Sequence, residues 1–154
     1  MKPISLRRLL LCLLIPLLGG GLASLLAGGY GAFSVLNKPP LSPPGLVFPI
    51  VWSLLYLMMG FAAYRVTDPR HTDTSAAMTK YYAQLLLNFL WPILFFRFRL
   101  FALAAAELVG LIVVLIAALL DFRRIDKTAG RLLLPYLVWC LFALYLNVGV
   151  SVLN

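Results

Sequence analysis

Charged residues are scarce in this chain, and histidine and cysteine are almost absent. Of 154 residues, 12% are charged, one is histidine and two are cysteine. With so few His, Cys and carboxylate side chains, the sequence predicts no metal site and no cofactor. The lone His71 lies in a polar stretch, so no serine of the apolar runs has a base for a hydrolytic triad. Cys12 and Cys140 both fall inside apolar runs and predict no disulfide framework. The residues therefore argue against conventional acid–base or nucleophilic catalysis.

Apolar residues, by contrast, make up 63% of the chain, and the mean hydropathy is +0.99. This is far more apolar surface than one small soluble core hides, so we expect an integral membrane protein. The net charge of +8 does not indicate a nucleic-acid partner, because the basic residues sit in short groups between apolar stretches. They are placed as anchors that flank membrane spans.

Five apolar stretches are long enough to cross the roughly 30 Å hydrocarbon core of a bilayer, which takes about 20 helical residues. The short segment Arg97–Leu100 between the third and fourth predicts a tight hairpin. We expect a single membrane domain, residues 1–154, folded as an all-α bundle of five transmembrane helices. The expected spans lie near residues 6–28, 46–66, 79–97, 100–120 and 131–152.

The first apolar stretch has two interpretations. Lys2, Arg7 and Arg8 precede it and small residues follow its apolar run, as in a cleavable signal peptide. However, the small residues continue smoothly through the run, and cleavage would leave a bundle of four spans. We favour a retained first span, and the mature N-terminus distinguishes the two interpretations.

Basic residues are distributed unevenly between the two ends of the expected bundle. Ten of the 13 lie on the side of the N-terminus, and an excess of Lys and Arg marks the cytoplasmic side of a membrane protein. We therefore expect a cytoplasmic N-terminus, with the loop after the first span outside. The ten are Lys2, Arg7, Arg8, Arg65, Arg70, Lys80, Arg123, Arg124, Lys127 and Arg131, and the other three are Lys38, Arg97 and Arg99.

The loop between the first two expected spans is rich in proline. Proline fixes φ and removes a backbone donor, so the segment Lys38–Gly45 forms neither a helix nor a central strand. We expect residues 30–45 to form a stiff loop that closes the end of the bundle as a lid over a ligand site. Its prolines are Pro39, Pro40, Pro43 and Pro44.

A few polar residues fall inside the expected spans. Glu107 is the only acid well within one, where ionisation is costly. It either takes part in a proton or ligand relay or forms a helix-to-helix tie, a polar contact that joins two helices. A single acid makes no relay chain, so we favour the tie. Asn88 and Asn147 each need a partner, which a neighbouring helix or a polar ligand group supplies.

Three tryptophans, Trp52, Trp91 and Trp139, also fall inside expected spans. Tyr56 and Ala143 follow Trp52 and Trp139 by one helical turn, so each pair shares a helix face. A small residue beside a large ring leaves room for a flat ligand, which makes these faces candidates for a pocket wall below the lid. The alternative is that the aromatic side chains simply pack the core.

Three motifs stand in order along the chain. The first is Lys38–Gly45 (KPPLSPPG) leading to Trp52; the second is Gln84–Pro92 (QLLLNFLWP) with Phe95 and Phe96; the third is Pro135–Trp139 (PYLVW) with Phe142 and Ala143. Together they resemble the translocator protein family over residues 10–150. Its bacterial members are called tryptophan-rich sensory proteins, and its older name is peripheral benzodiazepine receptor. The resemblance indicates a bacterial membrane protein.

This resemblance implies a five-helix bundle whose first loop closes a cavity for porphyrins and synthetic benzodiazepine-site ligands. It implies that Trp52 and Asn88 contact the carbonyl group of a bound ligand, and that Trp139 and Ala143 line the cavity. Further ligand-binding candidates are Tyr56, Trp91, Pro43 and Pro44. A porphyrin or another hydrophobic small molecule is the expected ligand.

The chain departs from the family pattern at two places. Leu41 stands where the family usually has tryptophan, and Ala32 and Phe33 stand where it has an aromatic pair. The ligand preference is therefore expected to differ. The cholesterol motif of animal members is absent, since Val148 replaces its tyrosine and no Lys or Arg follows Arg131, so we do not predict cholesterol recognition.

Small residues recur every fourth position on the first and fourth expected spans, which permits close helix contact. They serve either packing within one bundle or a homodimer, which also fits the resemblance. The first set is Gly19, Ala23, Ala27 and Gly31, and the second is Ala102, Ala106 and Gly110.

We therefore expect a membrane receptor or transporter-like protein for porphyrins. The resemblance also allows an enzyme: some bacterial relatives are said to degrade protoporphyrin under light, and the positions of Trp52 and Trp139 are implicated. Such photochemistry needs no catalytic triad. A third hypothesis is a structural or regulatory membrane protein without a pocket.

Overall fold

The computed structural model describes residues 5–154 and consists of helices joined by short loops. The long helices are α1 (Leu6–Ala27), α2 (Val47–Val66), α3 (Ser75–Pro92), α4 (Phe101–Ile125) and α5 (Lys127–Leu153). A 3₁₀ helix, η1 (Gly31–Val35), lies in the first loop, and a π-helical turn, η2 (Ile93–Arg97), continues α3. Residues 5–154 contain no β-strand, which confirms the expected all-α fold.

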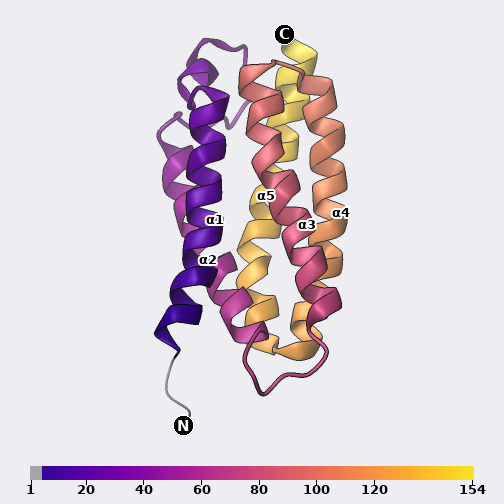
Figure 1. The fold of residues 1–154 in the computed structure, drawn as a ribbon. Helices are drawn as coiled ribbons and strands as arrows, with labels where there is room; N and C mark the ends of the chain where they lie inside the picture. The colour runs from indigo at the N-terminus through magenta and orange to yellow at the C-terminus, as the bar shows by residue number, and fades with distance from the viewer. Residues whose placement is uncertain (1–4) are drawn as a thin grey trace.

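The five long helices run side by side and form a closed ring (Figure 1). In the order of their contacts, α1 packs on α2, α2 on α5, α5 on α4, α4 on α3, and α3 with η2 on α1. One continuous apolar core fills the ring, and Met59, Leu115 and Leu133 are fully buried in it. The C-terminal helix therefore lies between α2 and α4.

Four helices, α1, α2, α4 and α5, are long and apolar enough to span a membrane by length and composition alone. Helix α3 is less apolar because it carries Lys80, Gln84 and Asn88. Nevertheless, α3 with η2 runs along the bundle beside α4 (Figure 1), and both Gln84 and Asn88 are buried inside the ring. The expected bundle of five helices is confirmed.

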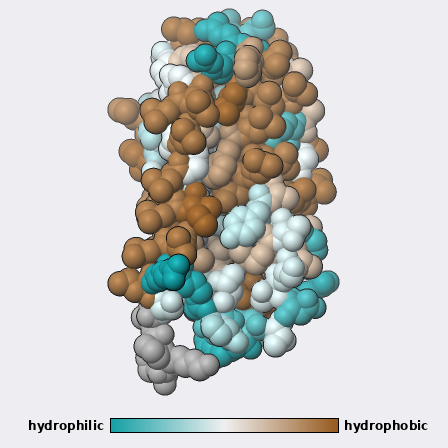
Figure 2. Space-filling model, in the orientation of Figure 1, coloured by the Kyte–Doolittle hydropathy of each residue, from teal (hydrophilic) through white to brown (hydrophobic). Residues whose placement is uncertain are grey.

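Hydrophobic side chains cover most of the face shown in Figure 2, and hydrophilic side chains gather toward its two ends. Large apolar residues such as Leu25, Val113 and Val138 are exposed on the outer sides of their helices. A surface of this kind and extent is suited to hydrocarbon rather than to water. The bundle is that of an all-α membrane protein.

The helix ends near residue 126 differ from the sequence-based expectation. Residues 121–130, expected to lie outside the fourth and fifth spans, are helical except for Asp126. The Asp126 carboxylate caps α5 by accepting the Ala129 N–H at 2.8 Å, and it accepts two hydrogen bonds from Arg65 at 2.7 and 3.1 Å. These bonds, above all those from Arg65, hold the pKa of Asp126 below its usual value. Polar residues here extend both helices, so hydropathy ended the fourth span too early and began the fifth too late.

Small residues of α1 allow α2 and α3 to approach closely. A Cβ added at Gly60 of α2 would lie 2.5 Å from the Cys12 carbonyl oxygen of α1. At Gly19 and Gly20 the same position is filled by the rings of Phe89 and Tyr56. Gly19, Ala23 and Ala27 of the expected first set are therefore packed within the chain, whereas Gly31 lies in η1 and a Cβ there would meet no atom within 4 Å.

The small residues of α4 are placed differently. Ala102, Ala106 and Gly110 all lie on its exposed side, and a Cβ added at Gly110 would meet no atom within 4 Å. Packing within the chain does not explain this second set.

Gly60→Ala tests the contact between α1 and α2. The added methyl group would push the two backbones apart, and we expect it to lower the stability by about 1–3 kcal/mol, the usual cost of overpacking. Thermal unfolding in lipid nanodiscs, followed by circular dichroism, measures the effect. Gly21→Ala is the matched control: a Cβ there meets nothing within 4 Å, so it should leave the midpoint unchanged or slightly higher. Equal losses in both variants would contradict the close contact.

Candidate functional site

A small cavity lies beneath the first loop, where η1 meets α2, the junction of α3 with η2, and α5. Its free interior is about 10 Å³, the room of roughly one water molecule. Two residues predicted from the sequence, Trp91 and Ala143, lie on its wall. The full wall consists of Phe33, Phe48, Trp91, Phe95, Phe96, Ala143, Leu146 and Asn147.

Aromatic rings form most of this wall and pack on one another. The rings of Phe33 and Phe48 meet edge to face with centroids 4.9 Å apart, and those of Phe95 and Phe96 do so at 4.8 Å. Tyr30 joins the two pairs, since its ring stacks on Phe48 at 5.6 Å and meets the Phe96 ring edge-on at 5.3 Å. Small-molecule sites usually enclose roughly 300–1,000 Å³, so a porphyrin enters only if these rings move apart.

Asn147 is the only polar residue on the cavity wall, and its side chain is already engaged. Its Oδ1 accepts a hydrogen bond from Trp91 Nε1 at 2.9 Å, and its Nδ2 donates to the Phe101 carbonyl oxygen at 2.8 Å. These bonds tie α3, α5 and the start of α4 together. The sequence marked Asn147 as an amide in need of a partner but did not place it at the site.

Phe48 was missed by the sequence analysis, although a signal existed. It precedes Trp52 by four residues and therefore shares the helix face that carries Trp52 and Tyr56. The structure places Phe48 on the cavity wall, and Trp52 and Tyr56 follow it at successive turns away from the lid.

Asn88, Trp52 and Tyr56 do not line this cavity; they belong to a buried layer deeper in the bundle. The Tyr56 hydroxyl donates to Asn88 Oδ1 at 2.7 Å, and Asn88 Nδ2 donates to the Tyr136 hydroxyl at 2.9 Å. The Tyr136 hydroxyl in turn donates to Gln84 Oε1 at 2.8 Å. One N–H of the Asn88 amide is thus used by Tyr136, and the second N–H donates to no described residue.

Trp52 packs within this buried layer, and Trp139 packs beside the cavity wall. Trp52 stacks on Tyr56 with centroids 5.6 Å apart and meets Tyr136 edge-on at 6.0 Å. Trp139 meets the ring of Phe48 edge-on at 6.1 Å, one ring away from the cavity. Its indole Nε1 is buried and has no hydrogen-bond partner among the described residues. Trp139 thus retains an unused donor beside the site.

The lid is held by the end of α5 rather than by Pro43 or Pro44. Pro43 is half-buried and Pro44 exposed, and neither forms part of the cavity wall. Pro39 is the buried proline, and a Cβ added at Gly149 of α5 would lie 2.5 Å from its Cγ. The packing of Pro39 therefore requires glycine at position 149.

Hydrogen bonds complete this attachment of the lid. The Tyr145 hydroxyl donates to the Pro40 carbonyl oxygen at 2.7 Å. The Asn37 N–H donates to Asn154 Oδ1 at 3.1 Å, and Asn154 Nδ2 donates to the Asn37 carbonyl oxygen at 2.8 Å. Between these points Leu41 is 84% exposed and has a φ of 68°, a left-handed value that is strained for leucine.

Comparison with known proteins identifies this architecture. A model of the TspO/MBR family matches residues 10–153. The chain belongs to the TspO/MBR family. It is 34% identical to the tryptophan-rich protein TspO of Chlorobaculum tepidum over 94% of this chain and 91% of that protein. It is 38% identical to the tryptophan-rich sensory protein of Cereibacter sphaeroides over 77% of this chain and 74% of that protein. It is 35% identical to the translocator protein of Sus scrofa over 87% of this chain and 82% of that protein.

Membership of the TspO/MBR family confirms the resemblance that the three motifs indicated. It also shows that the apolar helices belong to a membrane protein with bacterial relatives. The ligand roles of Trp52, Asn88, Trp139 and Ala143 stay predictions.

Asn88→Leu tests the buried polar layer. It would leave the Tyr56 hydroxyl without its acceptor, while the Tyr136 hydroxyl keeps Gln84, and an unsatisfied buried group costs about 1–3 kcal/mol. We expect a lower midpoint of thermal unfolding in nanodiscs. Adding Tyr56→Phe should recover part of the loss, because it removes one orphaned hydroxyl. Additive losses in the double variant would show that the two side chains are not coupled.

Proposed function

We propose that this protein is a membrane receptor or transporter-like protein that binds porphyrins and related hydrophobic molecules in the cavity under the first loop. The observation that carries the proposal is the cavity wall itself, in which five of eight residues are aromatic and the one polar side chain is already paired. Flat apolar molecules stack favourably on such rings. The names of the relatives, sensory protein and translocator protein, agree with ligand sensing or transport.

Binding would begin with separation of the ring pairs that Tyr30 joins. The widened cavity would then extend toward Trp52 and Asn88, where a ligand carbonyl would accept a hydrogen bond from the second N–H of the Asn88 amide. Such an opening would bring the ligand to Trp52 and Asn88, neither of which lines the cavity as it stands.

Ala143→Phe tests this site. The side chain of Ala143 is 2% exposed and borders the cavity, so a phenyl ring there would fill the space that a ligand needs. Titration of protoporphyrin, followed by tryptophan fluorescence, should show at least about tenfold weaker binding, equivalent to roughly 1.4 kcal/mol. Val138→Phe is the control, because Val138 is exposed on the outer side of α5 and lies in no proposed contact. Absence of porphyrin binding to the natural chain, or unchanged affinity in a folded Ala143→Phe variant, would refute the proposal.

A second candidate function is light-dependent degradation of protoporphyrin. It is favoured by the position of Trp139, an oxidisable ring in contact with Phe48 of the cavity wall. Illumination of the purified protein with protoporphyrin should then yield a new product. The double variant Trp52→Phe, Trp139→Phe should lose this product while it still binds porphyrin. Undiminished product in that variant would rule out a role for the two tryptophans.

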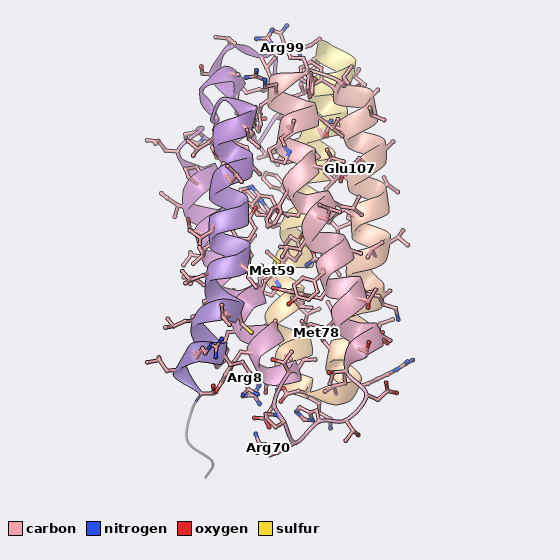
Figure 3. All side chains as sticks on the ribbon, viewed as in Figure 1. Arg8, Met59, Arg70, Met78, Arg99 and Glu107 are labelled. Atoms are coloured by element: carbon pink, nitrogen blue, oxygen red, sulfur yellow. The ribbon has the colours of Figure 1, made fainter. Side chains whose placement is uncertain are left out.

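The distribution of charge supports a cytoplasmic N-terminus. Figure 3 shows Arg8 and Arg70 at the end of the bundle near the N-terminus and Arg99 at the opposite end, beside the lid. With most basic residues at the first end, the positive-inside rule directs the lid outward. The exposed small residues of α4 support contact with a second copy, because they permit close approach of helices in lipid.

A further inference from the structure

Glu107 is the only charged residue between the two ends of the bundle. Figure 3 shows it on α4, away from both ends. The chain has no Asp, Glu, Lys or Arg at residues 9–37, 39–64, 81–96, 100–106, 108–120 or 132–154. No cation of the membrane-spanning segments is therefore present to pair with its carboxyl group.

The carboxyl group of Glu107 also has no polar partner in the structure. Both of its oxygen atoms are buried, and neither has a hydrogen-bond partner among residues 5–154. On the antiparallel helix α5, Cys140 is the titratable residue close enough to interact electrostatically with it. Residues 83–96 of α3 and η2 contain no titratable side chain. The expected helix-to-helix tie is therefore not formed.

These observations determine which form of the carboxyl group is stable. An ionised carboxylate in hydrocarbon, without a cation or donor, is so costly that the group takes up a proton instead. We propose that Glu107 is a proton-carrying site in the membrane. The residue as a whole is half-buried, and rotation of its side chain toward the bilayer would let the neutral carboxyl group donate to lipid-soluble molecules that bear a hydrogen-bond-accepting nitrogen or oxygen atom. Because no residue of α4 lines the porphyrin cavity, this site is separate from the proposed function.

The composition of the chain offers a selective measurement of the protonation state. Glu107 is the only glutamate among the five acidic residues, so glutamate labelled with ¹³C at the carboxyl carbon reports on this group alone. In lipid bilayers at neutral pH, infrared spectra should show the carbonyl stretch of a carboxylic acid that shifts with the label and is lost in Glu107→Gln. Labelled aspartate is the internal control: Asp68, Asp121 and Asp126 are paired with Arg or Lys at the end of the bundle and should show carboxylate bands. A carboxylate band for the labelled glutamate would overturn the proposal.

Access from the bilayer is tested with dicyclohexylcarbodiimide, a lipid-soluble molecule with accepting nitrogens. The acid proton moves to a carbodiimide nitrogen, a carboxyl oxygen bonds to the central carbon, and an acyl shift to nitrogen leaves a stable N-acylurea that retains every atom. Mass spectrometry should find this adduct on Glu107, in at least tenfold excess over Asp121 and Asp126, and none in folded Glu107→Gln. Lack of an adduct on a protonated Glu107 would overturn the claim that the site receives molecules from the bilayer.

Discussion

The buried amide of Asn88 holds the interior of this bundle together. In a bilayer the lipid tails are as apolar as the helix surfaces, so burial of apolar area does little to select one helix arrangement over another. Hydrogen bonds and close backbone contacts decide it instead. Asn88 of α3 bonds to Tyr56 of α2 and Tyr136 of α5, and these three helices lie around the core. Their relative rotation is therefore set by one amide group and two hydroxyl groups.

The cavity is the space between this polar layer and the lid. No residue of the layer lines the cavity, and on its wall Trp91 and Asn147 are held by a hydrogen bond whereas the phenylalanine rings are not. The lid is fixed at several points on α5 through Pro39, Pro40 and Asn37. The cavity thus has a tethered lid and a wall made largely of phenylalanine rings that no hydrogen bond holds. The strained, exposed Leu41 lies on this lid.

Much of the fold could be predicted because a membrane span has a simple requirement of length and polarity. The expected positions of α1 and α2 agree with the structure to within a residue at most ends, and the short hairpin before α4 is present. The expectation was wrong at residues 121–130, because the helices continue into polar surroundings where Asp126 caps α5 and pairs with Arg65. The aromatic and small residues at helical spacing led to Trp91 and Ala143 on the cavity wall. They did not reveal Phe48 or the engaged state of Asn147, since both depend on neighbouring helices.

By itself the sequence determined the class of protein, the number of helices, the proline-rich lid and the family, because apolar runs and ordered motifs are local properties of the chain. Only the tertiary structure decided which polar groups are occupied. Asn88 and Asn147 found partners on other helices, whereas Glu107 and the Trp139 indole did not. The physical reason is that the outer faces of these helices are as apolar as the inner ones. Hydrophobic periodicity therefore cannot show which way a polar side chain faces or what it meets there.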